Sequence, residues 1–131
     1  MKSELLAHLH DILQAGQAVT GFVAGRTFQD YCHDELLRSG VERKFQIMGE
    51  ALNRVSRQDP RVLDQIRNYR EIISFRNILV HGYDSIDDRI VWDTIQSDLA
   101  NLIEDVKGLL ALQKAAEKEA GADGDDAAPQ P

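Results

Sequence analysis

The sequence predicts an all-α fold, a bundle of long helices packed around one core. Apolar residues recur at three- and four-residue intervals through most of the chain, which is the spacing of one face of an amphipathic helix. Apolar side chains make up 43% of the 131 residues and there are only three prolines, which favours helices over a loop-rich fold. We therefore expect four main helices with short helical pieces between them.

The first helix is expected from Ser3 to about Val23, with Gly25 ending it. Its inward stripe consists of Leu5, Leu6, Leu9, Ile12, Leu13, Val19, Phe22 and Val23. His8 and His10 are two residues apart, so they point to different faces of the helix. Zinc-binding histidines on a helix have i, i+4 spacing, and we therefore take both as surface residues.

A second, longer helix is expected to begin at residues 27–30, Thr-Phe-Gln-Asp, which resemble a capping box with aspartate in place of glutamate. It should continue to about Arg57 with an apolar stripe formed by Leu37, Val41, Phe45, Met48, Leu52 and Val55. Glu50 on this helix is either a catalytic carboxylate or a surface carboxylate that pairs with a nearby arginine, and we leave it outside the catalytic set. Asp59-Pro60 ends the helix, and a short helical piece can follow over residues 61–66.

The third main helix is expected to start near Asn68 and to end at Gly82. Its inward stripe consists of Ile72, Phe75 and Leu79. Ile73 and Val80 lie off that line, which indicates either a wide core face or a second apolar contact.

The fourth main helix should span residues 88–112, with Trp92 in the core or at an interface and a stripe of Val91, Ile95, Leu99, Leu102, Val106 and Leu109. Residues 84–88 before it lack the glycine and terminal glutamate of a calcium loop, so they are read as a loop and an N-cap, and no metal site is predicted. From residue 115 onward Ala, Gly, Asp and Pro dominate. We therefore expect a helical domain over 1–114 and a disordered acidic tail over 115–131.

The charge distribution is uneven. The net charge is −7, yet residues 38–76 hold nine Lys and Arg against five Asp and Glu. A local positive cleft on an acidic body is therefore possible, whereas a general nucleic-acid coat is not expected. Cys32 is the only cysteine, which fits a reducing cytoplasm, and no segment resembles a signal peptide or a membrane span.

Residues 74–83 carry the side chains most able to do chemistry. On a helix Asn77 and His81 are an i, i+4 pair, and Arg76 and Tyr83 are an i, i+7 pair, so four polar groups gather near one helix end. Histidine moves a proton near neutral pH, and arginine holds a phosphate with two parallel hydrogen bonds. Neither role needs a metal. The pattern suits RNA phosphodiester cleavage, and its alternative is a solvated cationic helix end favoured by the helix dipole.

The run Arg76-Asn77-x3-His81-x-Tyr83 resembles the Arg-x4-6-His signature of the HEPN superfamily, in the form typical of HepT-like toxins. Two further segments agree in family order. Residues 41–52 resemble the helix that precedes the motif, and residues 90–95 resemble the opening of the helix that follows. The resemblance covers roughly residues 3–112.

This resemblance implies a HEPN-type helical bundle that acts as a metal-independent endoribonuclease toxin, without a cofactor, in the cytoplasm. It implies a homodimer in which Arg76 and His81 are catalytic and Asn77 and Tyr83 support them. The implied partner is an MntA-like minimal nucleotidyltransferase antitoxin that transfers AMP to Tyr83. The alternative is a non-catalytic HEPN module that binds a nucleotide or a protein.

Overall fold

The computed structural model describes residues 3–81 and 86–127, with side chains described up to residue 119. Among the described residues the regular secondary structure is entirely helical, which confirms the all-α class. Their bounds are α1 Ser3–Val23, α2 Phe28–Cys32, α3 Glu35–Gln58, α4 Pro60–Leu63, α5 Tyr69–His81, α6 Asp88–Ser97 and α7 Leu99–Ala127. None of these helices is both long enough and apolar enough to cross a membrane.

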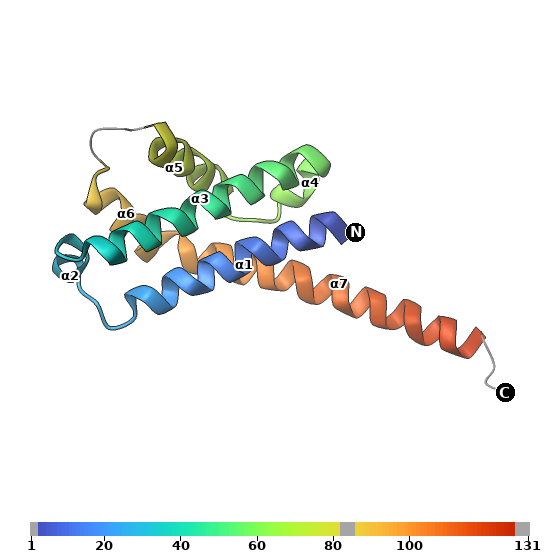
Figure 1. The fold of residues 1–131 in the computed structure, drawn as a ribbon. Coiled ribbons are helices and arrows are strands. Elements are labelled where there is room, and N and C mark those ends of the chain that lie inside the picture. The colour runs from blue at the N-terminus through green and yellow to red at the C-terminus, as the bar shows by residue number, and fades with distance from the viewer. Residues whose placement is uncertain (1–2, 82–85, 128–131) are drawn as a thin grey trace.

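Helix α3 lies at the centre of the bundle and packs against both α1 and α5. Helix α7 packs against α1 and α6, and Figure 1 shows α1 and α3 running side by side with α5 crossing α3. The apolar stripes predicted for α3, α5 and the α6–α7 segment are all buried. In α1 the prediction is wrong for Phe22, which is 40% exposed, whereas Leu13 and Val23 are half-buried but pack against the core, and Leu6 is half-buried.

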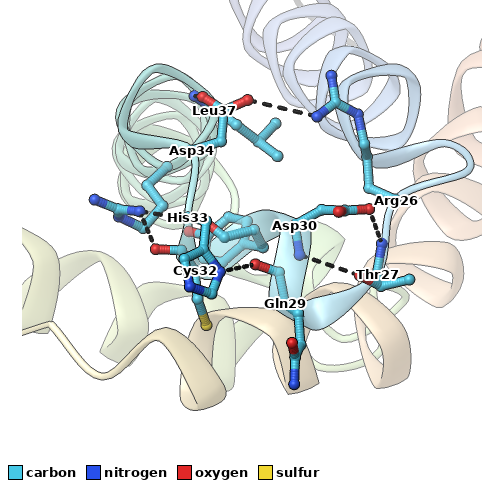
Figure 2. Close-up of polar contacts among 10 residues, drawn as sticks. Arg26, Thr27, Gln29, Asp30, Cys32, His33, Asp34 and Leu37 are labelled. Atoms are coloured by element: carbon cyan, nitrogen blue, oxygen red, sulfur yellow. Dashed lines mark hydrogen bonds and ion pairs between the residues drawn. The ribbon is translucent and has the colours of Figure 1, made fainter.

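The long second helix expected from Thr27 is divided into α2 and α3. The predicted capping box at Thr27 and Asp30 is present, but Asp34 forms a second N-cap, since its side chain accepts a hydrogen bond from the Leu37 backbone N–H at 3.0 Å. Figure 2 shows Arg26 reaching Asp34, at 3.4 Å, across this junction. The chain therefore turns at His33 and Asp34.

The fourth main helix is likewise divided, with Asp98 between α6 and α7. The apolar stripe is nevertheless buried on both sides of the break, because the Asp98 backbone stays near helical geometry and keeps the register. Helix α7 is also longer than expected, since it continues to Ala127, past the expected end at residue 112 and into the segment expected to be disordered from residue 115. Over residues 113–120 Ala, Glu, Lys and Gln favour helix without needing burial, which the apolar pattern could not indicate; the Gly and Asp of residues 121–127 do not explain the rest of the extension.

The start of α5 is attached to α7 by polar contacts. Arg67 donates to the Asp105 carboxylate from its backbone N–H, Nε and Nη2 at 2.8 to 3.0 Å. These hydrogen bonds from Arg67 lower the pKa of Asp105 below its ordinary value. Asn68 follows with φ 66°, a left-handed conformation that asparagine tolerates, and its Oδ1 accepts from Asn101 at 3.4 Å. Since Asn101 and Asp105 are one turn apart on α7, both contacts fix where α5 begins.

Candidate active site

Arg76 is placed by the close crossing of α5 over α3. Gly49 of α3 is buried against the Arg76 side chain, and a Cβ at position 49 would lie 2.5 Å from the Arg76 Cγ. Beside this crossing the Phe45 and Phe75 rings pack edge to face, with 5.0 Å between their centroids. Only glycine permits this approach, so α3 contributes to the position of the motif arginine.

The Arg76 guanidinium is partly buried and has two described partners. Its Nη2 lies 3.5 Å from the Glu50 carboxylate, and its Nη1 donates to the Asn77 Oδ1 at 3.2 Å. Its Nε is buried and has no hydrogen-bond partner among the described atoms. Glu50 thus takes the second of the two roles open to it, that of a carboxylate paired with an arginine. The arrangement holds the guanidinium in place and leaves the second N–H of Nη1 and of Nη2 without a described partner, whereas Nε is shielded from solvent.

His81 is the last residue of α5 and its side chain is exposed. Within the described residues Asn77 bonds to Arg76 rather than to His81, so its role in orienting the histidine stays a prediction. Tyr83 and Gly82 lie outside the described residues. The structure therefore places Arg76 and Asn77 in contact and His81 at the exposed end of the same helix.

An exposed apolar residue, Ile78, lies on the same side of α5 as His81. Ile78 is 49% exposed and precedes His81 by three residues, so the two side chains are neighbours on the helix surface. Of the two residues predicted to lie off the main stripe, Ile73 packs against the core and Val80 is half-buried. Ile78 was not singled out from the sequence, because spacing alone does not tell which apolar residues a tertiary contact covers.

A polar cavity of about 310 Å³ lies beside Arg76, between α3 and α5. It is lined by Glu50, Asn53, Arg54, Arg57 and Arg76. The excess of positive charge over residues 38–76 predicted a basic region, but it did not predict which residues line the cavity. Their spacing on α3 was the available signal, because positions 50, 53, 54 and 57 share the helix face opposite the buried stripe.

Other polar candidates lie away from this site. His8 is half-buried, not on the surface as expected, and its Nε2 lies 3.4 Å from the Gln58 Nε2. In the described part of the chain no three His, Cys, Asp or Glu side chains are grouped so as to hold a metal ion. Tyr31 is fully buried and its ring packs against Trp92, with 5.7 Å between the centroids, which makes it a core residue.

The structure holds a paired arginine beside a basic cavity and places an exposed histidine at the end of the same helix, and both are side chains that RNA cleavage can use. Comparison with known families agrees with this chemistry. The model of the family described as "Ribonuclease HepT-like" matches residues 12–109, and the chain belongs to this family.

Several relatives support a ribonuclease function. A protein of Caldanaerobacter subterraneus subsp. tengcongensis, provisionally named an RNase, is 29% identical over 107 residues, which cover 82% of this chain and 95% of the relative. A probable ribonuclease HepT of Thermococcus cleftensis is 29% identical over 102 residues, covering 78% and 92%. A provisionally named RNase of Methanocaldococcus jannaschii is 28% identical over 106 residues, covering 81% and 96%. No solved structure matches the chain at a significant level.

Proposed function

We propose that this protein is a metal-independent endoribonuclease, the toxin of a toxin–antitoxin pair, and that it cuts RNA at a cleft between two copies of the chain. The observation that carries the proposal is the Arg76 guanidinium. It is held between Glu50 and Asn77 beside a basic cavity, on the helix that ends in His81. Family membership and the names of the relatives support the ribonuclease part.

The chemistry needs few protein groups. The 2′-oxygen of RNA attacks the adjacent phosphorus and gives its proton to a histidine acting as base. The bond from phosphorus to the 5′-oxygen breaks, that oxygen takes a proton from an acid, and a 2′,3′-cyclic phosphate remains. Arg76 would stabilise the charge that develops on the phosphate oxygens, and His81 would serve in proton transfer.

A dimer supplies what one copy lacks, because the reaction needs a base and an acid together and each motif has a single histidine. A two-fold interface over Ile78 would cover an exposed apolar side chain that neighbours His81. It would also bring the two α5 ends, and hence two histidines, to one cleft.

The test of this function is cleavage of single-stranded RNA by purified protein in excess chelator. His81→Ala should lower the rate by about 10² to 10⁴ while leaving helical content unchanged. His10→Ala is the matched control, since His10 is an exposed histidine on α1, away from the motif. His81→Ala protein that cuts RNA at the parental rate would refute the catalytic assignment.

Neutralisation is proposed to occur at Tyr83. A nucleotidyltransferase antitoxin would transfer AMP from ATP to the tyrosine oxygen and release pyrophosphate. The new phosphodiester could pair with Arg76 and compete with the RNA phosphate, and the adenylyl group would fill the cleft. Of the other two tyrosines, Tyr31 is fully buried and Tyr69 is half-buried. The assignment to Tyr83 rests on the resemblance of its motif position to that of HepT-like toxins.

The modification is tested by intact-mass analysis of toxin co-expressed with its neighbouring nucleotidyltransferase. We expect an AMP adduct on the wild type and on Tyr69→Phe, and no adduct on Tyr83→Phe. An adduct confined to Tyr69, or no adduct on inactive co-purified toxin, would leave neutralisation by simple binding as the better account.

A further inference from the structure

The wall of the polar cavity on α3 contains two arginines without a described polar partner. The chain has ten arginines, and in the described residues Arg54 and Arg57 are the two for which no hydrogen bond, ion pair or ring contact is found. The other eight bond to a carboxylate, a carbonyl, an amide or a phenol, or lie over an aromatic ring: Arg26, Arg38, Arg43, Arg61, Arg67, Arg70, Arg76 and Arg89. The two exceptions line the same cavity.

The charge balance of the cavity favours an anion. Three guanidinium groups face one carboxylate, that of Glu50, and this carboxylate already pairs with Arg76. Arg54 and Arg57 are three residues apart on one helix, so their charges repel each other unless a counter-charge lies between them. In a protein of net charge −7, such a local positive excess is not a general property of the surface.

The span of α3 that lines the cavity indicates more than one anion. Arg57 is seven residues beyond Glu50, which corresponds to about 10 Å along the axis of α3 at 1.5 Å per residue. The Arg76 guanidinium lies beside Glu50, at the start of this span, and its two parallel N–H groups match a single phosphate. A group held by Arg54 and Arg57 therefore lies beyond the phosphate that Arg76 contacts.

We propose that Arg54 and Arg57, with the Asn53 amide beside them, bind a phosphate of the RNA strand next to the one that is cut. This inference rests on the proposed function and narrows its substrate to single strands longer than a dinucleotide. Arg76 would act at the scissile phosphate, and the α3 arginines would hold the neighbouring part of the strand in register.

The experiment compares an octanucleotide with a dinucleotide, which has a single phosphodiester, for the wild type and the double variant Arg54→Gln/Arg57→Gln. Binding of the octanucleotide is measured in the His81→Ala background by fluorescence anisotropy at several salt concentrations. We expect about tenfold weaker binding, and a salt slope smaller by about 0.7, the value for one phosphate contact of a single strand. In cleaving protein, the preference for the octanucleotide over the dinucleotide should fall by a similar factor, through KM rather than kcat.

The control is Arg61→Gln, four residues beyond Arg57, which removes one positive charge, where the double variant removes two, from an exposed side chain that pairs with Asp59. It should leave binding and cleavage unchanged. The double variant should melt no lower than the wild type, because it relieves repulsion and breaks no described contact. Equal losses in Arg61→Gln and the double variant, or an undiminished preference for the octanucleotide, would overturn the proposal.

The same measurements distinguish a failure of the ribonuclease assignment from a failure of the α3 site. If the wild type cuts neither oligonucleotide, the ribonuclease assignment fails, and octanucleotide binding by the double variant still decides whether α3 contains a strand-binding site. If the wild type cuts both and the double variant binds the octanucleotide normally, the ribonuclease stands and the α3 site is wrong.

Discussion

The two ends of α5 differ in how their polar groups are satisfied. At the start, Arg67 and Asn68 bond to Asp105 and Asn101 of α7. Toward the end, the Arg76 Nε is buried without a described partner, His81 is exposed and Ile78 stands 49% in solvent. The start of α5 is therefore anchored by polar contacts with α7, whereas polar groups toward its end have no described protein partner or are exposed.

We propose that, in the thirteen-residue helix α5, the contacts at the start serve stability and the groups toward the end serve cleavage. Polar groups that are fully paired have no capacity left for a substrate, whereas a half-paired guanidinium and an exposed imidazole keep theirs. The contacts at the start fix the position of the helix, and the Gly49 crossing transmits that position to Arg76. Substitutions at the two ends should accordingly affect different measurements.

The largest effect on the cleavage rate is expected when the Arg76 guanidinium is replaced. Arg76→Lys keeps the charge but cannot form two parallel hydrogen bonds to a phosphate, so the single-turnover cleavage rate should fall by about 10² or more. Helical content by circular dichroism should not change. Arg70→Lys is the control on the same helix, since Arg70 stacks on Tyr69 at the anchored end. A cleavage rate for Arg76→Lys within threefold of the parental rate would show that Arg76 does not act through two parallel hydrogen bonds to a phosphate.

The second effect concerns association. Ile78→Asp places a charge on the apolar surface proposed to join two copies, and the protein should sediment as a monomer at micromolar concentration with cleavage lost. Ile90→Asp is closely matched, because Ile90 is also 49% exposed but lies on α6. The parental dimer should be largely insensitive to salt. Dissociation by both variants, or by neither, would place the interface elsewhere.

The third effect is smaller and lies at the crossing that links the two ends. Gly49→Ala forces the Arg76 stem away from α3, so we expect a loss of stability of about 1–3 kcal/mol. Displacement of the guanidinium by about 1 Å should also lower the cleavage rate by up to about 10²-fold.

Gly108→Ala is its control, because a Cβ there meets no atom within 4 Å and the substitution in α7 should be neutral or stabilising by up to about 1 kcal/mol. Chemical denaturation and the cleavage rate of both variants check this. A Gly49→Ala protein as stable and as active as Gly108→Ala would show that α3 tolerates a wider crossing.

Much of the helical framework could be predicted from the sequence, because helix stripes and caps are local. The bounds of α1, the capping box at Thr27 and the buried stripe of α3 follow from spacing within a few residues. The breaks at Asp34 and Asp98 were missed, since an aspartate in a continuous apolar pattern can be either a surface residue or a cap.

The candidate site could be predicted only as a set of residues. The motif identified Arg76 and His81, and the alternatives for Glu50 included its ion pair with an arginine. The Gly49 contact and the alignment of Arg54 and Arg57 with Arg76 depend on how α5 crosses α3. No pattern within one helix contains that information.

The smallest expected effect is a pH dependence at the anchored end. Because its hydrogen bonds with Arg67 lower the pKa of Asp105 in the folded protein, the carboxylate stabilises the fold above its ordinary pKa of 3.8, and this contribution is lost as the pH falls through the lowered folded value. Asp105→Asn should therefore melt a few degrees below the wild type at pH 7, and the difference should shrink as the pH falls below about 4.

Glu104→Gln tests the same anchor more weakly, since Glu104 lies 3.4 Å from the Arg67 guanidinium and its side chain is 76% exposed. Its melting temperature should stay close to that of the wild type at both pH values. Cleavage by Asp105→Asn, measured well below its melting temperature, should remain near the parental rate if the anchored end serves stability alone. A loss of activity in Asp105→Asn without a loss of stability would instead mean that the contacts with α7 position Arg76 directly, and the separation between the two ends of α5 would not hold.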